Sequence, residues 1–589
     1  MRKYSFRVKW LLLVCGCLAI AGWCAVGAAP PDQPPHNRWV EGFNTAGIGA
    51  DTVWVTMRDG TRLATTIGKP FWGSNFPTVL IRTPYEVEQG YLDIITTLLP
   101  LSGYAVAVQY TRGRFDSEGE DRVFQDDGWG ENQDGYDTVE WIAAQSWSDG
   151  KIGTWGLSAL AIAQSLMAGA APPHLTCQYI SYGVSKAYDQ VTYQGGAFRK
   201  ALVTGWLTGQ GSLHMLPEFQ AHPTEDTFWD QYDIESRHPL ITAPALFVGG
   251  FYDCFLQGTI NEFVGRQTNG GEGAIGNNRL ILGPWTHVNE TDTRQGQLRY
   301  PDNSTISISD QVELVLDWFD YWLKGEDNGV LSGEPVRYYL MSDVDTETDY
   351  GNEWRISPVW PPVAHEGELY LHPEGALDAT IPQANDEPVQ ITFNPTNPIP
   401  THGGANLEID EGPYDQTPIE TRGDVITFTT EPLTQPLEVA GRVSAVIYAS
   451  CNISDMDLSV RLSDVYPDGR SMLLCDGILR AGFRDGFQAK VPMRPGEVYQ
   501  CEIDLWSTAI AFNTGHRIRL SIANSNYPRF DLNPAYSLIG QQGYPDSLET
   551  LIYCDAAHPS TLVLPVIAPA PGEHPLLPID TGVLDWDVR

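Results

Sequence analysis

The sequence predicts an α/β fold with a mostly parallel sheet covered by helices, followed by a separate all-β domain. Continuous apolar runs at residues 77–82 and 104–109 are typical of strands that are buried on both faces. A strand, a tight turn and an apolar helix follow at residues 151–169. The last third of the chain instead carries short strand-like runs between turn residues, as at 442–449 and 517–522. Alternating strands and helices imply a parallel sheet, so the two parts differ in class.

Length and charge limit the organisation of the chain and its partners. At 589 residues the chain is too long for one core, and two or three domains are expected. Hydrophobic residues make up 42% and aromatic residues 11%, which are values of a globular protein. The formal net charge is −38, so we expect no binding to nucleic acid or to anionic membranes.

Residues 1–28 read as a signal peptide. Four cations within the first nine residues precede an apolar run over residues 10–26 and a small-residue site at Ala28. Cleavage after Ala28 would leave a net charge of about −42. No other run is long and apolar enough to span a bilayer, so we expect a secreted or periplasmic protein with no stable membrane anchor. An uncleaved anchor remains the alternative.

Six cysteines follow the leader. An even number permits disulfides in an oxidising compartment, and buried free thiols are the alternative. The sequence has no Cys-x-x-Cys and no clustered Cys/His spacing, so neither a metal site nor a cofactor is expected. The six are Cys177, Cys254, Cys451, Cys475, Cys501 and Cys554.

The first α/β segment is assigned to residues 40–175. It opens with an alternating hairpin at 52–67 and continues with the two buried strands and a helix at 134–145. After it, residues 176–240 are rich in glycine and aromatic residues without clean strands, and we interpret them as an inserted cap. The sheet resumes over 241–350.

The strand-to-helix turn at Ser158 is the first candidate site. Gly156 and the alanines after the serine leave room for a sharp turn, and the following helix is apolar on all sides and therefore buried. A serine held at such a turn is how a nucleophile elbow presents its hydroxyl. Gly-x-Ser alone is a weak pattern, and a small-residue packing turn is the alternative.

Two later strands end on residues that complete this site. Asp253 follows the strand at 243–249, and His287 follows the strand at 279–283. Functional residues in open α/β sheets lie just beyond the carboxyl ends of strands, and the order Ser, Asp, His is that of α/β-hydrolases. We therefore expect Ser158 as nucleophile, His287 as base and Asp253 as its orienting acid. A helix-capping Asp253 and an ordinary loop His287 are the alternatives.

Ordered motifs along nearly all of the mature chain resemble the CocE/NonD group of serine hydrolases, which includes cocaine esterase, X-prolyl dipeptidyl-peptidase and α-amino-acid ester hydrolase types. The motifs are Met57-Arg-Asp-Gly-Thr-Arg-Leu, Arg82-Thr-Pro-Tyr85, Asp134-Gly-Tyr-Asp-Thr-Val-Glu-Trp-Ile, Trp147-Ser-Asp-Gly-Lys-Ile-Gly, Pro284-Trp-Thr-His287 and Trp318-Phe-Asp-Tyr-Trp-Leu-Lys-Gly. The resemblance implies an α/β-hydrolase domain, a helical cap inserted after the elbow helix, and a C-terminal β jelly roll. A proline-rich joint at 358–362 places that last domain at 363–589.

The resemblance also implies an oxyanion hole. The geometry of the elbow makes the backbone N–H of Ala159 one donor, and the resemblance implies the hydroxyl of Tyr85 as the other. An ordinary turn aromatic after a proline is the alternative for Tyr85. The family usually reads Gly-x-Ser-Tyr-x-Gly at the elbow, whereas this chain has Ala159 and Ala161. Both residues are small, so we expect activity with an altered pocket shape.

A second departure concerns the substrate. The α-amino-acid ester hydrolases carry acidic residues after the catalytic Asp and in the cap, whereas here Cys254, Phe255 and Leu256 follow Asp253 and the stretch 190–195 is uncharged. A buried ammonium without a carboxylate is costly, so we expect a neutral, partly aromatic acyl group. The candidate pocket walls, which could equally be plain core aromatics, are Phe198, Trp206, Trp229 and Phe255.

These features predict an exported serine carboxylesterase that cleaves small-molecule esters through an acyl-enzyme on Ser158. An amide hydrolase of the same mechanism, of the β-lactam acylase or X-prolyl dipeptidyl-peptidase type, is the nearest alternative. Because Ala159 and Ala161 depart from the usual elbow motif, a third hypothesis stays open, that the chain is a binding protein with a degenerate active site.

Overall fold

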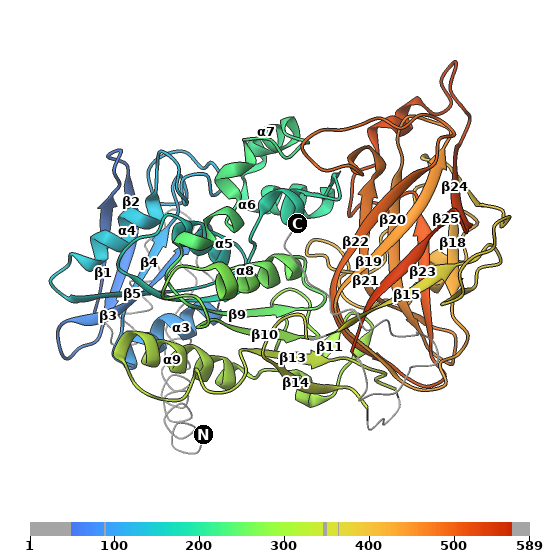
Figure 1. The fold of residues 1–589 in the computed structure, drawn as a ribbon. Helices are drawn as coiled ribbons and strands as arrows, with labels where there is room; N and C mark the ends of the chain where they lie inside the picture. Colours follow the sequence, from blue (N-terminus) through green and yellow to red (C-terminus); the bar gives the residue numbers. More distant parts are fainter. Residues whose placement is uncertain (1–48, 87–89, 346–349, 363, 568–589) are drawn as a thin grey trace, which may run out of the picture.

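The computed structural model describes residues 49–86, 90–345, 350–362 and 364–567. An α/β part and an all-β part lie side by side in it, and helices of the chain's middle third stand above the junction (Figure 1). The expected signal peptide at residues 1–28 lies outside the described residues. In the part of the chain that is described, no helix combines the length and apolarity needed to cross a membrane.

One ten-stranded sheet forms the α/β part. Its strand order is β1-β2-β4-β3-β5-β6-β9-β10-β13-β14. The strands from β4 through β3 to β13 pair in parallel, and the pairs at both edges are antiparallel. The strands are β1 (Gly49–Thr56), β2 (Arg62–Lys69), β3 (Phe76–Thr83), β4 (Ala105–Tyr110), β5 (Ser148–Leu157), β6 (Leu175–Ser181), β9 (Ala245–Gly250), β10 (Arg279–Gly283), β13 (Val336–Leu340) and β14 (Glu353–Ser357). The predicted α/β class is confirmed.

Helices cover both faces of this sheet. The helices α3 (Gly90–Leu101) and α9 (Ile308–Lys324) pack on one face, where their apolar residues share a core with Trp155 and Tyr179. The opposite face is covered by α4 (Asp134–Ala143), α5 (Ala159–Gly169) and α8 (Leu256–Asn269). The two groups stand on opposite sides of the sheet in Figure 1. Strands buried on both faces explain the continuous apolar runs of the sequence.

The cap lies between β6 and β9. Its regular elements are β7 (Tyr193–Gln194), β8 (Ala197–Phe198), α6 (Lys200–Gln210) and α7 (Leu216–Ala221). The predicted start at 176 is wrong, because residues 175–181 form β6, which is hydrogen-bonded between β5 and β9. The predicted end of the second α/β segment at 350 is also too early, because β14 pairs with β13. In both places the domain boundary in the structure comes after a strand of the α/β sheet, whereas the predicted boundary came before it.

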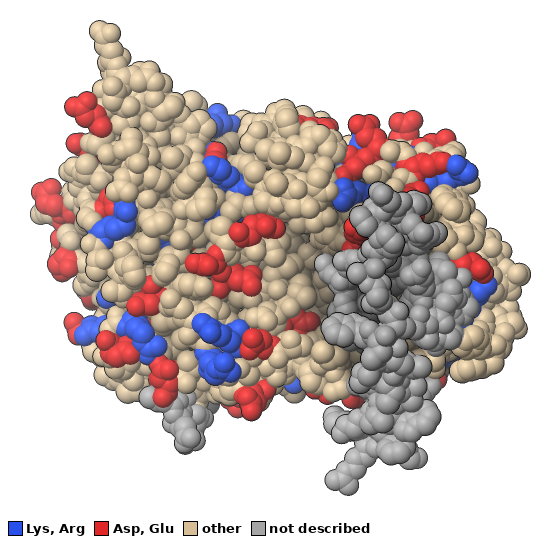
Figure 2. All heavy atoms as spheres, turned by 180° about the vertical axis from the view of Figure 1, so that it is seen from behind, with Lys and Arg blue, Asp and Glu red and all other residues tan. Residues whose placement is uncertain are grey.

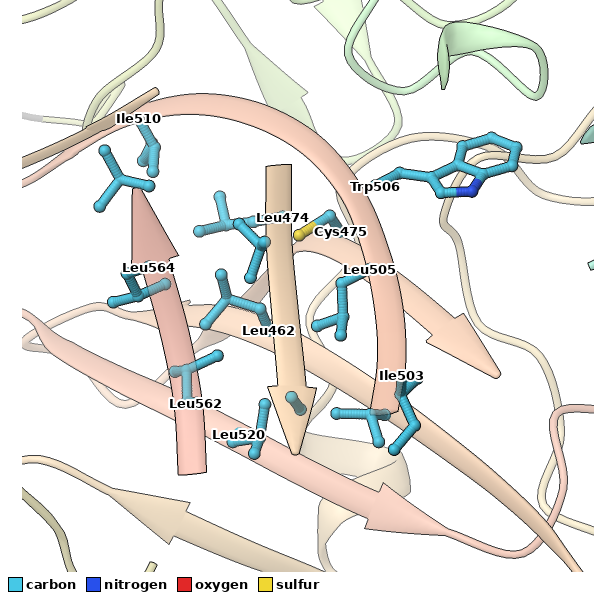
Figure 3. Packing of buried hydrophobic residues seen from close by; sticks show 14 of the residues in the cluster. Leu462, Leu474, Cys475, Ile503, Leu505, Trp506, Ile510, Leu520, Leu562 and Leu564 are labelled. Carbon is cyan, nitrogen blue, oxygen red and sulfur yellow. The ribbon is translucent and has the colours of Figure 1, made fainter. Parts of the chain in front are cut away.

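The all-β part is a sandwich of antiparallel strands. The sheet with β16-β15-β26-β19-β24-β17, to which β22 and β25 attach, faces the sheet β18-β23-β20-β21. Leu462 and Leu520 of one sheet meet Leu562 and Leu564 of the other in the core (Figure 3). The strands are β15 (His365–Leu371), β16 (Leu377–Asp378), β17 (Val389–Phe393), β18 (Val425–Thr429), β19 (Leu437–Cys451), β20 (Asp457–Val465), β21 (Ser471–Arg480), β22 (Tyr499–Phe512), β23 (Arg517–Ala523), β24 (Leu548–Asp555), β25 (His558–Pro559) and β26 (Thr561–Val566).

Further short elements among the described residues are β11 (Arg294–Gln295), β12 (Leu298–Arg299) and α10 (Thr417–Glu420). The two parts are joined by backbone pairing as well as by side chains. Met341, just after β13, donates to the carbonyl of Ala509 at 3.0 Å and accepts from the N–H of Ala511 at 2.8 Å. One apolar cluster continues from Tyr338 and Met341 into the sandwich. The position of the sandwich is therefore fixed against the α/β part.

All six cysteines after the leader are buried and unpaired, so the disulfide alternative is not realised in the structure. The face shown in Figure 2 carries both Asp/Glu and Lys/Arg side chains, and in its lower left part the two signs lie beside each other. This face therefore carries both signs of charge, while the whole sequence has an acidic excess.

Candidate active site

Ser158 lies at a strained turn between β5 and α5. Its φ of 55° and ψ of −125° fall in a region that residues other than glycine avoid. The turn is tight: a Cβ added to Gly156 would lie 2.7 Å from the Cβ of Leu160. The N–H of Ser158 donates to the carbonyl of Ser181 at 3.0 Å, which ties the turn to β6. The strand, the turn and the buried helix together present the Ser158 hydroxyl just beyond the carboxyl end of β5.

The loops after β9 and β10 bring the two other predicted residues to this hydroxyl. His287 Nε2 lies 2.9 Å from Ser158 Oγ, and His287 Nδ1 lies 2.6 Å from Asp253 Oδ1. The Asp253 side chain is fully buried, and its Oδ2 accepts from the N–H of Phe255 at 3.1 Å. A proton on Nδ1, held by the carboxylate, leaves Nε2 as the acceptor for the serine hydroxyl. The geometry is that of a nucleophile, a base and an orienting acid.

Aromatic rings confine the imidazole. The ring centroids of Tyr182 and Phe255 lie 5.3 and 5.5 Å from that of His287. The Tyr182 hydroxyl donates to Glu290 at 2.7 Å, and burial raises the pKa of that carboxyl. The base is therefore held in one orientation by packing as well as by Asp253.

Two donors face the place where an oxyanion would form. The Tyr85 hydroxyl is within hydrogen-bonding reach of Ser158 and accepts from the indole N–H of Trp206 at 3.0 Å. Burial raises the pKa of Tyr85, so the hydroxyl keeps its proton at neutral pH. Ala159 is the first residue of α5, and its N–H has no acceptor within the helix. Both sequence-predicted donors thus lie beside the serine.

An apolar pocket opens onto Ser158. The empty space within it, the open mouth included, is about 780 Å³. Three of the four predicted aromatic walls, Trp206, Trp229 and Phe255, line it. Phe198 does not: it packs against Tyr193 with centroids 5.5 Å apart. The remaining lining residues are Val123, Phe124, Ala159, Ile162, Leu166, Val184, Ala187, Val191, Thr192, Leu202, Val203, Leu207, Phe219, Tyr232, Ile234 and Leu407.

The C-terminal part contributes residues to the site that sequence reasoning missed. Leu407 lines the pocket, and the Glu411 carboxyl lies beside Thr286 and His287. Burial raises the pKa of Glu411. The segment 401–416 has no pattern that could signal this approach. Sequence reasoning also missed the hydrogen bond from the indole N–H of Trp206 to the Tyr85 hydroxyl, because it predicted Trp206 only as a wall of the pocket.

Asp253, Cys254 and His287 are the one group of potential metal ligands found in the described residues. Their closeness follows from the hydrogen bond between Asp253 and His287. The Cys254 thiol lies 4.0 Å from Nδ1, and burial raises its pKa well above the usual value, which keeps it protonated and a poor ligand. The arrangement suits proton transfer better than metal binding.

Comparison with known proteins agrees with this architecture. Residues 59–216 and 209–289 match the family model of X-Pro dipeptidyl-peptidase (S15 family), and residues 328–563 match the model of its C-terminal non-catalytic domain. A cocaine esterase from Rhodococcus sp. (strain MB1 Bresler) is 30% identical over 588 residues, covering 88% of this chain and 98% of that protein.

Two solved structures share the fold over most of their length. An aminopeptidase from a marine sediment Thaumarchaeota archaeon aligns with a TM-score of 0.78 at 23% identity, over 92% of this chain and 99% of its own. An α-amino acid ester hydrolase aligns with a TM-score of 0.73 at 22% identity, over 92% and 98%. At this identity the two structures support the fold alone.

Proposed function

Because the chain belongs to the CocE/NonD-type serine hydrolases of the S15 family, and is therefore a serine ester or peptide hydrolase, we propose that it is a carboxylesterase using Ser158, His287 and Asp253. One observation carries the proposal. The imidazole of His287 bridges Ser158 Oγ and Asp253 Oδ1 at 2.9 and 2.6 Å, at the mouth of an uncharged pocket.

In the proposed reaction Ser158 Oγ attacks the ester carbonyl while its proton passes to His287 Nε2. The tetrahedral oxyanion accepts hydrogen bonds from the Tyr85 hydroxyl and the Ala159 N–H, and each such donor is typically worth about 3 kcal/mol. The carbonyl re-forms, the alcohol leaves with the proton from His287, and an acyl-serine remains. Water, deprotonated by the same imidazole, then releases the acid.

The pocket favours a neutral acyl group, aromatic or aliphatic. All of its lining residues are uncharged, and Thr192 and Ser158 are among the few that carry side-chain oxygens. An ammonium ion placed against such walls would lose its hydration without gaining a carboxylate. The preference also agrees with an ester-cleaving relative, the Rhodococcus cocaine esterase.

Amide cleavage by the same residues is the second candidate, favoured by the match to X-Pro dipeptidyl-peptidase models. A dipeptidyl-peptidase binds a free N-terminal ammonium, which the pocket walls do not complement. Ester cleavage therefore remains the preferred reading.

A burst assay with p-nitrophenyl butyrate tests the proposal. We expect the wild type to release one equivalent of nitrophenolate rapidly and then turn over, and Ser158→Ala to do neither. Parallel rates on the matched p-nitroanilide separate ester from amide cleavage, with the ester faster. A wild type that is folded but gives no burst and no turnover on either substrate would contradict it.

We also propose that the chain is exported, on the strength of the charged and apolar leader at residues 1–28. Expression in a bacterial host followed by N-terminal sequencing checks this. The expected mature protein begins after Ala28 and is found outside the cytoplasm. Full-length protein retained in the cytoplasm would contradict it.

A further inference from the structure

Arg199 is a buried cation beside the catalytic acid. It precedes α6, and only 1% of its surface is exposed. Its Nη2 donates to the carbonyl of Cys254 at 3.1 Å and its Nη1 to the carbonyl of Gln190, while the buried Nε has no hydrogen-bond partner. None of the ion pairs between described residues includes it. The guanidinium therefore binds the backbone of the residue that follows Asp253.

The third contact of Arg199 comes from the C-terminal sandwich. Its guanidinium carbon lies 5.4 Å from the ring centroid of Trp506, over the face of the indole. Trp506 lies on β22 with a φ of 67°, which a residue with a side chain rarely adopts. In Figure 3 its indole points away from the leucines of the sandwich core. Arg199 thus joins the cap, the loop after β9 and the sandwich.

A buried guanidinium without a carboxylate in contact is unfavourable for folding. Burial lowers the pKa of Arg199 to about 10, so it remains charged at neutral pH. The Asp253 carboxylate is buried as well, and its direct hydrogen-bond partner is the imidazole of His287. The two buried charges attract each other across the Cys254 peptide. Each reduces the cost of burying the other.

We propose that Arg199 is a positioning residue for the catalytic acid, holding the Asp253 loop by the Cys254 carbonyl and favouring the deprotonated Asp253–His287 couple through its charge. This inference rests on the proposed function, because it assigns a role within the same site. Trp506 makes the C-terminal sandwich part of that support.

The sign of the charge effect follows from the proton count. Uptake of one proton changes the Asp253–His287 couple from −1 to neutral, and a nearby cation opposes this uptake. Without Arg199 the couple is protonated at higher pH, so the acid limb of the rate profile moves up. Two other carboxyls, Glu290 and Glu411, act on the couple, and both have a pKa raised by burial.

Two further titratable neighbours, the Cys254 thiol and the Tyr182 hydroxyl, have pKa values raised well above their usual range by burial. They stay neutral where the enzyme works. Neither therefore adds a charge beside the Asp253–His287 couple between pH 5 and 8.

The test compares ester hydrolysis against pH in the full-length wild type and three variants. In Arg199→Met we expect kcat to fall about tenfold through a misplaced acid, and the acid limb to rise by about half a pH unit through the lost charge. Arg199→Lys keeps the positive charge but loses the planar set of guanidinium donors. The acid limb of its pH–rate profile should therefore match that of the wild type, and its kcat should lie between those of Arg199→Met and the wild type.

Arg461→Met is the matched control. Arg461 lies on β20 and is equally buried, with Nη1 and Nη2 lacking partners. Asp476 and Arg529 act on its charge as they do on that of Arg199, but Asp253 acts on Arg199 and is not among the charges that act on Arg461. We expect this variant to keep the wild-type pH profile and kcat, whatever its thermal stability.

A folded Arg199→Met with kcat within twofold of wild type and an unmoved acid limb would overturn the inference. Should that variant not fold, an acid limb raised in Arg199→Lys, which keeps the charge, would overturn it equally. Turnover by the wild type that is lost in Ser158→Ala establishes the proposed function independently of either result.

Discussion

The Tyr85 hydroxyl has one hydrogen to donate, and the indole N–H of Trp206 occupies one of its lone pairs. Its own O–H stays free to donate, and Ser158 is within hydrogen-bonding reach. We predict that Tyr85→Phe lowers kcat by about 10²–10³-fold with little change in KM, since the bond forms in the transition state. The control is Tyr448→Phe, whose hydroxyl bonds Gln500 in the sandwich. A kcat for Tyr85→Phe within threefold of wild type would assign the oxyanion to other donors.

The backbone of Ser158 is strained. Its φ of 55° and ψ of −125° are accessible to glycine at little cost. We predict that Ser158→Gly, though inactive, is more stable than Ser158→Ala by about 1 kcal/mol in the free energy of unfolding. Its thermal midpoint should therefore be higher. Calorimetry of the two variants side by side checks this. Equal midpoints would mean that the turn is unstrained.

The nucleophile elbow depends on the close approach of β5 to α5. A Cβ at Gly156 would lie 2.7 to 2.8 Å from three atoms of Leu160, two of them backbone. We predict that Gly156→Ala displaces the start of α5, reducing both kcat and thermal stability. Gly209→Ala on α6, where an added Cβ meets nothing within 4 Å, is the control and should be neutral or slightly stabilising. A fully active Gly156→Ala would show that the elbow tolerates a wider turn.

Local patterns explain which elements could be predicted. Ser158, Asp253 and His287 each follow a buried strand, so a short window of sequence reveals their place at the edge of the sheet. Residues that reach the site from elsewhere leave no such trace. Leu407 enters the pocket from the C-terminal part, about 250 positions after the elbow, and Phe198 turns away from it because β8 pairs with β7. Their positions depend on how the parts dock.

At the scale of the whole molecule, charged side chains of the cap and of the sandwich interact across their junction. Asp189 and Glu235 of the cap repel each other and are both attracted by Arg442 of β19. The Oδ1 of Asp189 is buried without a hydrogen-bond partner, and burial raises its pKa to about 7 from 3.8. Between these two values the folded chain binds more protons than the unfolded chain, so this group's contribution to stability falls as pH rises.

Replacing Asp189 tests this junction. We predict that Asp189→Asn raises the thermal midpoint at pH 8 by about 2 °C, and that the gain shrinks toward pH 5, where the buried aspartate is protonated. Asp230→Asn, on the exposed surface of the cap, should show no such pH-dependent gain. An equal gain for Asp189→Asn at both pH values would exclude titration of this carboxyl as the cause.

Covalent labelling tests the central claim, that Ser158 is a nucleophile activated by His287, most directly. The full-length protein is treated with a fluorophosphonate, and its intact mass and proteolytic fragments are measured. The account predicts one adduct per chain, on Ser158, absent from Ser158→Ala and formed far more slowly in His287→Ala. An unlabelled wild type, or an adduct on another residue, would contradict the account.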